Sequence, residues 1–399
     1  MRVDVAIVGA GGAGASVLIH LARLLRDAGE TSAPPRIAVI DPVHRATRDR
    51  TWCFWDDGAS ALDAIVHRCW TSILLVGPDG ASHRLDLTPL RYVMLRSQDV
   101  YALADTAAAE LGAVRIQAAA ENVRDGEAVA TVDTDEGPVE ARWVLDSRPA
   151  SPRRPPTTTL LQHFRGWSVR FRTDQLDPTA PLFMDFTVPA PPSGVAFGYV
   201  LPDDARRGLV EYTEFSRERL SDARYDEALT RYLGARWGAA GEPGAYEIEH
   251  VEDGAIPMTD AVPARRTGRR IVRLGTAGGA TRASTGYTFA AMQRQGAAVA
   301  AALLAGRDPL PPPAYPARHR WMDSVLLTGL DRGYIRGPEF LTRLFLALPA
   351  ERVLRFLDGR TSPAEDLSVL RATPVTTMTR ATASNAVARV RRRVLGAPV

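Results

Sequence analysis

The feature that most constrains this chain is a glycine-rich turn close to its N-terminus. Residues 9–14 read Gly-Ala-Gly-Gly-Ala-Gly and fit the spacing G-x-G-x-x-G. A short apolar run, Val3 to Val8, precedes the turn, and residues 15–26 follow it with apolar side chains at helical spacing. Strand, glycine turn and helix in this order predict a dinucleotide-binding unit, because glycine lets the backbone approach a pyrophosphate at the helix N-terminus.

A second apolar run, Ile37 to Ile40, reads as the next strand and ends on Asp41. An acid at this position typically accepts hydrogen bonds from ribose hydroxyls. We therefore predict cofactor-binding roles for Asp41 and for the glycines of the turn, namely Gly9, Gly11, Gly12 and Gly14. The alternative is a glycine turn in an unrelated α/β protein, and the motif does not distinguish NAD from FAD.

Another glycine turn lies far downstream. Residues 270–275 read as a strand that leads into Gly275, Gly278 and Gly279, and residues 289–304 read as a helix. A late strand and helix that return to the cofactor resemble flavoproteins more than NAD dehydrogenases. We therefore predict cofactor-binding roles for these three glycines and for Asp146, which ends an earlier strand; the alternative for residues 275–280 is a simple loop.

The remaining segments differ in their predicted secondary structure. Alternating strands between residues 157 and 260 predict an antiparallel sheet that lies over the flavin, and residues 310–370 are helical and apolar. The predicted fold is α/β: an FAD-binding Rossmann-like flavoprotein fold with an antiparallel β substrate domain and a helical C-terminal region. Its parts are a discontinuous FAD-binding domain (1–156 plus 261–309), a substrate domain (157–260), a helical region facing substrate or membrane (310–370) and a basic tail (371–399).

Composition excludes several classes of function. All 49 basic side chains among the 399 residues are Arg, so Schiff-base lysine chemistry and a Walker lysine are excluded. The formal net charge of +3 does not indicate a nucleic-acid binder. Two cysteines and seven scattered histidines indicate no metal site and fit a reducing cytoplasm. We expect neither a signal peptide nor a membrane-spanning segment.

Residues 49–55, Asp-Arg-Thr-Trp-Cys-Phe-Trp, resemble the D-R-T-W-x-F motif of the lycopene cyclase family. Further segments resemble motifs of that family in the same order, and the resemblance extends to about residue 370. One departure is Pro149, where the family's strand-end motif usually has Gly. The matching segments are residues 91–94, 145–148, 161–167, 183–186, 199–202, 210–213, 256–258 and 275–287.

The resemblance implies cyclisation of the linear ends of lycopene to β-ionone rings, a reaction without net redox change that requires reduced FAD, with NAD(P)H as the reductant. Protonation of an isolated alkene needs a neutral acid in an apolar pocket, where burial raises a carboxyl pKa. The family's E-x-T motif maps onto Glu211 and Thr213, which we predict as catalytic residues. Alternation places both on one face of a strand with Leu209 and Phe215, while Glu214 points away. The alternative for Glu211 is a surface carboxylate.

A carbocation also needs stabilisation, which aromatic faces can supply. The predicted pocket wall consists of Trp52, Phe54, Trp55, Phe164, Trp167, Phe183 and Phe186. The alternative for each of these is core packing. Arg50 is predicted to contact the flavin phosphate, or else to cap a turn.

A C40 polyene resides in the bilayer, so we expect a cytoplasmic protein that associates peripherally with the membrane. Residues 340–357 show Leu and Phe side chains that look exposed, and the tail carries six Arg and no acid. A basic amphipathic segment suits anionic headgroups; the alternative is a solvated, partly disordered tail.

Other functions remain open on the sequence. One is a flavin-dependent monooxygenase or halogenase-like oxidoreductase that consumes NAD(P)H. Another is a cyclase of a different terpenoid, and a third is a carotenoid-binding flavoprotein without catalysis.

Overall fold

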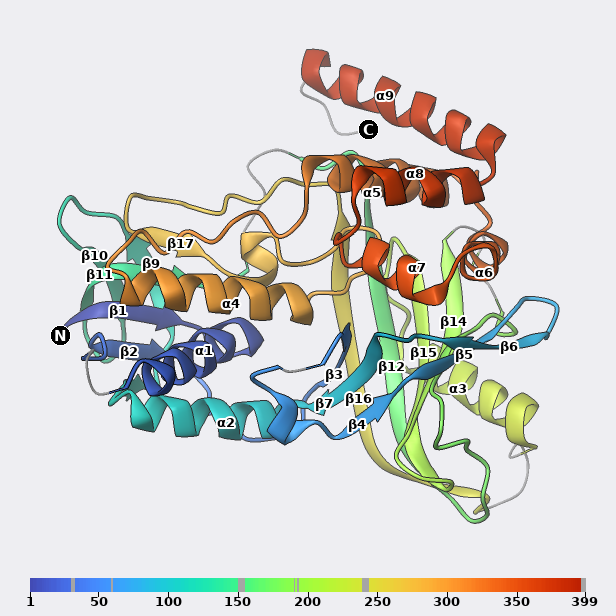
Figure 1. Ribbon diagram of the computed structural model, residues 1–399, viewed down its shortest axis with the longest axis horizontal. Coiled ribbons are helices and arrows are strands. Elements are labelled where there is room, and N and C mark those ends of the chain that lie inside the picture. Colours follow the sequence, from blue (N-terminus) through green and yellow to red (C-terminus); the bar gives the residue numbers. More distant parts are fainter. Residues whose placement is uncertain are drawn as a thin grey trace.

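The computed structural model describes residues 1–29, 33–58, 60–149, 155–189, 191, 194–238 and 244–395, with side chains described to residue 392. These residues form three sheets. Figure 1 shows the predicted nucleotide-binding part and the part with long strands side by side, with the C-terminal helices along one edge. Residues 150–154, just before the predicted domain boundary at residue 156, and residues 396–399 of the basic tail lie outside the described residues.

The first sheet contains the predicted dinucleotide-binding unit. Its central strand β1 (Arg2–Val8) pairs in parallel with β2 (Ile37–Ile40) and β11 (Val139–Asp146). Val8 lies opposite both Ile40 and Asp146, so the three strands end at one edge of the sheet. The late strand β17 (Ile271–Arg273) joins β11 in parallel at that edge. The other strands are β8 (Val114–Ile116), β9 (Ala120–Arg124) and β10 (Ala130–Thr134).

Three helices belong to this part: α1 (Gly12–Ala28), α2 (Ser97–Glu110) and α4 (Phe289–Leu304). Helix α4 has the bounds that the sequence predicts, and it lies along α1 (Figure 1). A Cβ on Gly296 would fall 2.8 Å from the backbone carbon of Ser16, so the absence of a side chain lets these two helices approach.

The second sheet carries the long strands, in the order β16 (Tyr246–Thr259), β12 (Thr159–Phe171), β15 (Arg207–Ser216), β14 (Val195–Pro202), β13 (Leu182–Asp185), β5 (Ser72–Val76) and β6 (Ser82–Asp86). Its pairs are antiparallel except for β13 with β5. The antiparallel sheet was predicted, but its extension by β5 and β6 was not. A small third sheet consists of β3 (Thr51–Asp56), β7 (Arg91–Arg96) and β4 (Arg68–Trp70), with a 3-10 turn, η2 (Asp63–Ile65), between β3 and β4.

The second sheet separates two apolar clusters. On one face, α3 (Asp222–Trp237) packs against side chains such as Trp167 and Val210. On the other face, Leu209 and Phe215 belong to a cluster shared with the C-terminal helices. The two faces therefore follow the alternation of residues along β15 that the sequence predicts.

The helices that cover this second face are α5 (Ala317–Asp331), α6 (Gly337–Ala347), α7 (Ala350–Leu357) and α8 (Pro363–Ala372). The sequence interpretation of exposed Leu and Phe over 340–357 was wrong for most of them. Phe340, Leu344, Phe345 and Leu354 are buried against the sheet, whereas Leu346 is exposed. The apolar side chains of α6 and α7 therefore belong to the core. They pack on the face of the second sheet that carries Leu209 and Phe215, which we call its inner face.

The basic tail forms a helix, α9 (Val375–Leu395), that packs on α5. Asn385 is buried in the contact, and its Nδ2 donates to Ser324 Oγ at 2.7 Å and to Thr328 Oγ1 at 2.9 Å. The alternative of a solvated tail is therefore wrong for residues 375–392. Within the described part of the chain, no helix has both the length and the hydropathy to cross a bilayer.

Candidate active site

The glycine turn between β1 and α1 has the geometry that a pyrophosphate needs. Gly9 has φ of +95°, and a Cβ on Gly14 would collide with the Gly9 carbonyl oxygen. A Cβ on Gly11 would meet no atom of the described residues within 4 Å, and this N-cap residue of α1 provides no side-chain acceptor. The first-turn N–H groups of α1 are therefore available to an anionic ligand, and the turn fits a dinucleotide.

Asp41 lies against this turn. Its Oδ2 accepts from the Ala10 amide at 2.8 Å and from Arg45 Nε at 3.1 Å, and its Oδ1 accepts from the Val43 amide at 3.0 Å. A carboxylate offers about four acceptor positions, so these bonds orient Asp41 and leave room for a ribose hydroxyl.

The predicted late turn meets the first one. Residues Gly275–Gly278 form a 3-10 turn, η3, in which Gly275 has φ of +60°, and Gly279 follows at +85°. A Cβ on Gly275 would lie 3.0 Å from Ala13 Cβ, in the first turn of α1. The structure thus brings the two glycine turns together, although they are more than 250 residues apart.

Asp146 supports this junction. It is almost fully buried, and its Oδ2 accepts from Arg273 Nη1 at 2.7 Å and from Arg148 Nη2 at 3.0 Å. Through these two arginines Asp146 fixes β17 against β11, and a direct contact with a cofactor stays a prediction.

A cavity of about 360 Å³ lies between the inner face of the second sheet, β3, the loop at residues 284–288 and helices α5–α7. Met292 connects it to the glycine turns, because a Cβ on Gly12 would be 3.3 Å from Met292 Cε and one on Gly275 would be 3.5 Å from its Sδ. Gln162 Oε1, also on the lining, accepts no hydrogen bond within the described residues, so an acceptor is available for a bound molecule.

Glu211 and Thr213 both line this cavity. The Thr213 hydroxyl donates to Glu211 Oε1. Burial raises the pKa of Glu211 to about 8, an effect that the nearby Glu252 carboxyl reinforces and the Thr213 hydrogen bond opposes. Glu211 is therefore protonated at neutral pH. Glu214, on the other face of β15, accepts instead from the Tyr212 hydroxyl at 3.2 Å.

A second carboxyl, Glu252 on β16, lines the same cavity and was missed by the sequence interpretation. Its Oε2 accepts from Thr51 Oγ1 at 2.8 Å, and burial raises its pKa. Its strand reads Glu-Ile-Glu-His-Val-Glu-Asp over residues 247–253, which is typical of an exposed edge. The only signal for Glu252 was strand alternation with the apolar residues that follow it.

The structure brings some of the predicted aromatic residues to the cavity and not others. Trp52, Phe164 and Phe183 line it. Trp167 points to the α3 face, where it stacks near Tyr246, because it is an odd number of residues from Phe164 on β12. Phe54, Trp55 and Phe186 are buried behind the lining, against Phe289, Tyr287 and Phe197 respectively.

Tyr199 and Tyr287, which the sequence interpretation did not select, complete one wall, and the buried Tyr92 lies behind them. The Tyr92 hydroxyl lies 2.5 Å from that of Tyr199 and 3.3 Å from that of Tyr287. Cys53 adjoins them, and burial raises the pKa of its thiol to about 12. This wall is therefore uncharged at neutral pH.

Arg50 also lies on the lining, where its Nη1 donates to the Asp253 carbonyl oxygen at 3.1 Å. The structure thus places Arg50 beside β16. A contact with flavin phosphate stays a prediction.

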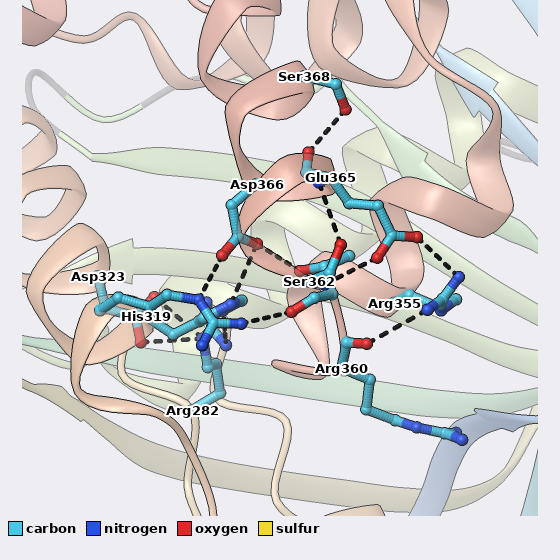
Figure 2. A network of polar contacts seen from close by, with 11 residues as sticks. Arg282, His319, Asp323, Arg355, Arg360, Ser362, Glu365, Asp366 and Ser368 are labelled. Atoms are coloured by element: carbon cyan, nitrogen blue, oxygen red, sulfur yellow. Dashed lines mark hydrogen bonds and ion pairs between the residues drawn. The ribbon is translucent and has the colours of Figure 1, made fainter.

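A buried polar network fixes the helical side of the cavity (Figure 2). Arg282, fully buried in the loop before the lining residues, donates through Nε to Asp323 at 2.9 Å and through Nη1 to His319 at 3.1 Å. The other ring nitrogen of His319, Nε2, lies 3.1 Å from Oδ1 of Asp366 on α8. Figure 2 labels these residues together. Burial and the charge of Arg282 lower the pKa of His319 to about 4, so its ring is neutral and can accept from Arg282.

Comparison with solved structures shows similar folds at low sequence identity. A geranylgeranyl bacteriochlorophyll reductase-like protein from Thermoplasma acidophilum is 13% identical, with 96% of this chain and 99% of that chain covered and a TM-score of 0.62. The flavin-dependent brominase Bmp2 is 13% identical (95% and 100% covered, TM-score 0.62). The flavin-dependent monooxygenase PieE, solved in complex with FAD and substrate, is 13% identical (98% and 72% covered, TM-score 0.56). These likenesses confirm the predicted α/β flavoprotein fold.

A search of curated proteins finds no match. The protein-family comparison, in contrast, matches residues 4–383 to the family described as lycopene cyclase protein. The match spans both glycine turns, the inner face of the second sheet and most of the C-terminal helices. On this evidence the chain belongs to the lycopene cyclase family.

Proposed function

We propose that this chain cyclises the linear ends of lycopene to β-ionone rings, without net oxidation or reduction. Family membership supports a hydrophobic carotenoid substrate. The observation that carries the proposal is Glu211, a buried carboxyl that stays protonated at neutral pH in a cavity with mostly apolar and aromatic walls. Such a group can protonate an isolated alkene, which is a very weak base.

The contacts of Glu211 suit this role. Thr213 donates to Oε1, which leaves Oε2 to carry the transferable proton. After proton transfer the substrate is a tertiary cation, and the faces of Trp52 and Phe164 on the cavity wall stabilise positive charge through their quadrupoles. The surrounding apolar side chains exclude water that would otherwise capture the cation.

The proposed cofactor is FAD in its reduced form, with NAD(P)H as the reductant. Gly9, Gly11, Gly12 and Gly14, with Asp41, would hold its dinucleotide portion. Reduced flavin supplies negative charge that stabilises a nearby cation without net electron transfer. Arg50 would contribute from the cavity side, and the late glycines and Asp146 would support the site where the two glycine turns meet.

The cavity takes one end of a polyene. Pockets of about 300–1,000 Å³ enclose drug-sized ligands, and at about 360 Å³ this cavity is at the small end of that range. A C40 chain is longer than a drug-sized ligand, so the rest of the molecule would extend beyond the cavity.

We further propose peripheral contact with a membrane surface through α9. This helix carries Arg389 and Arg391 and contains no acid, and Val387 and Val390 are exposed on it. Flotation with vesicles that contain anionic lipid is expected to recover the protein, and recovery should fall with salt and in R389Q/R391Q. Equal recovery with neutral vesicles would contradict this contact.

The function is tested by expression in a lycopene-accumulating host with pigment analysis. Wild type is expected to convert linear to cyclic carotenoid, E211Q to lose at least about 10²-fold of the rate, and E214Q to retain it. Glu214 is a matched control because it lies on the same strand, is similarly buried and faces the opposite side. A flavin-dependent monooxygenase would instead consume one NAD(P)H and one O₂ per turnover, and that stoichiometry would reject the proposal.

A further inference from the structure

Four residues form one transverse row across the second sheet. Tyr199 on β14 lies opposite Glu211 on β15, Glu211 lies opposite Gly166 on β12, and Gly166 lies opposite Glu252 on β16. Directly opposed residues of antiparallel strands project to the same face. The row therefore presents a phenol, a carboxyl, a gap and a second carboxyl, and its three side chains all line the cavity.

The gap at Gly166 lies between the two carboxylic acids. A Cβ at this position would lie 3.5 Å from Glu211 Cβ, 3.5 Å from Glu252 Cγ and 2.9 Å from Leu209 Cδ1. Any larger residue would separate the two acids and narrow the cavity floor. Because Gly166 has no side chain, one substrate end group resting on this row can face both carboxyls.

The two carboxyls have different surroundings. Glu211 accepts from Thr213, and no cation contributes to the shift of its pKa. Burial raises the pKa of Glu252 too, but the hydrogen bond from Thr51 and the charges of Arg48 and Arg50 oppose that rise and favour its ionised form. Glu252 thus has two cations that favour its ionised form and Glu211 has none, a difference suited to opposite roles in proton transfer.

We infer that Glu252 is the catalytic base that removes the proton after ring closure, opposite Glu211 as the acid. This inference rests on the proposed cyclisation and adds the second half of its chemistry.

The protons and electrons balance as follows. Glu211 transfers a proton to the terminal alkene, whose π electrons form the new C–H bond and leave a tertiary cation. A second alkene of the same chain attacks this cation, which forms the ring C–C bond and moves the positive charge into the ring. The Glu252 carboxylate takes a proton from the carbon beside the cation, and the electrons of that C–H bond become the ring double bond. Return of a proton from Glu252 to Glu211 completes the cycle, with no oxidant or reductant consumed.

The experiment compares E252Q with E211Q in D₂O, with lycopene as substrate and with the bound flavin of each protein measured by absorbance. The amide oxygen that E252Q introduces can still accept from Thr51, so this variant removes the base while keeping the contact. E249Q is the matched control, since Glu249 lies on the same strand and pairs with Arg170 at the surface, 3.0 Å away.

In wild type, each ring is expected to carry one deuterium from Glu211. In E252Q, ring formation is expected to fall at least about 10²-fold, while the recovered linear substrate gains deuterium, because protonation by Glu211 continues and reverses. E211Q should give neither rings nor deuterated substrate, and E249Q should behave as wild type. Ring formation by E252Q at the wild-type rate, or its loss without deuterium in the substrate, would overturn the assignment.

A second measurement does not depend on removing Glu252. In T51V the carboxylate loses a hydrogen-bond donor, so its pKa rises and the acidic limb of the pH–rate profile should move to higher pH. The charged groups that act on Glu252 in this profile are Arg48, Asp49 and Arg50 from the segment before β3 and Glu211 from β15. An unchanged acidic limb in T51V contradicts a base role for Glu252.

If wild type forms no rings at all, the proposed cyclisation fails, and that outcome differs from every variant result above.

Discussion

The ring of Trp52 stacks on the ring of Phe289, with centroids 4.8 Å apart and planes inclined by 20°. Trp52 belongs to β3, and Phe289 is the first residue of α4, so this pair joins the third sheet to the nucleotide-binding part. Both rings also line the cavity.

The Trp52–Phe289 pair should therefore contribute measurably to stability. F289A is expected to lower the free energy of unfolding by about 3 kcal/mol or more, since Phe289 is buried. A double-mutant cycle with W52A should give a coupling energy of about 1 kcal/mol. Chemical denaturation of the four proteins measures both values, and strict additivity would show that the stack adds nothing.

The pKa of Glu211 predicts a specific dependence of stability on pH. Folding raises this pKa from an ordinary value of 4.5 to about 8, so between these values the native state binds a proton that the unfolded state has released. Relative to E211Q, wild type should therefore lose about 1.4 kcal/mol of stability per pH unit as pH rises through this window, with the difference levelling above it. Urea unfolding of both proteins from pH 4 to 9 tests this, and parallel curves would contradict the raised pKa.

Two glycines of the first turn should respond differently to alanine. In G14A the new Cβ collides with the Gly9 carbonyl oxygen, so both thermal stability and flavin affinity should fall. In G11A the Cβ meets no atom within 4 Å in the part of the chain that the structure describes, so the melting temperature of the cofactor-free protein should not change. Flavin affinity should nevertheless fall in G11A, because the methyl group occupies the space of the pyrophosphate. Titration of apo-protein with FAD, followed by fluorescence, measures the affinity, and unaltered affinity of G11A would place the cofactor elsewhere.

The buried pair of Arg282 and Asp323 should be costly to break. D323A leaves the Arg282 charge buried without its carboxylate and is expected to cost about 3–5 kcal/mol. The control is E247A, which breaks an exposed ion pair with Arg170 and should cost about 1 kcal/mol or less. Denaturation midpoints of the two variants give the comparison, and equal costs would show that burial of the first pair has no effect.

Local patterns predicted the nucleotide-binding part well, because a strand, a glycine turn and a helix are each specified by adjacent residues. Alternation along β15 also placed Glu211 and Thr213 on one face. The same rule, applied to β12, separates Phe164 and Gly166 from Trp167, and choosing aromatic residues by type alone missed this separation. Glu252 was missed because its position in the site depends on the register between β16 and β12, which joins residues 86 positions apart.

The C-terminal helices show the same limit. The helical pattern of α6 was visible in the sequence, but the side that faces the core was not, since the sheet it covers is built from distant segments. The charge of the last segment did not reveal its packing either. Asn385 anchors α9 to α5 through the hydroxyls of Ser324 and Thr328. These residues are about 60 positions away in the sequence, so no local pattern connects them to Asn385.

The segment from Gly275 to Met292 belongs to two surfaces at once: its first residues touch the start of α1, and its last residues line the cavity. Occupancy of the dinucleotide site and occupancy of the cavity therefore act on the same short stretch of backbone, which Arg282 holds to the helices beyond. Thermodynamic linkage then requires reciprocity. By whatever factor the bound dinucleotide raises the affinity of the cavity for its polyene, the bound polyene raises the affinity of the chain for the dinucleotide by the same factor.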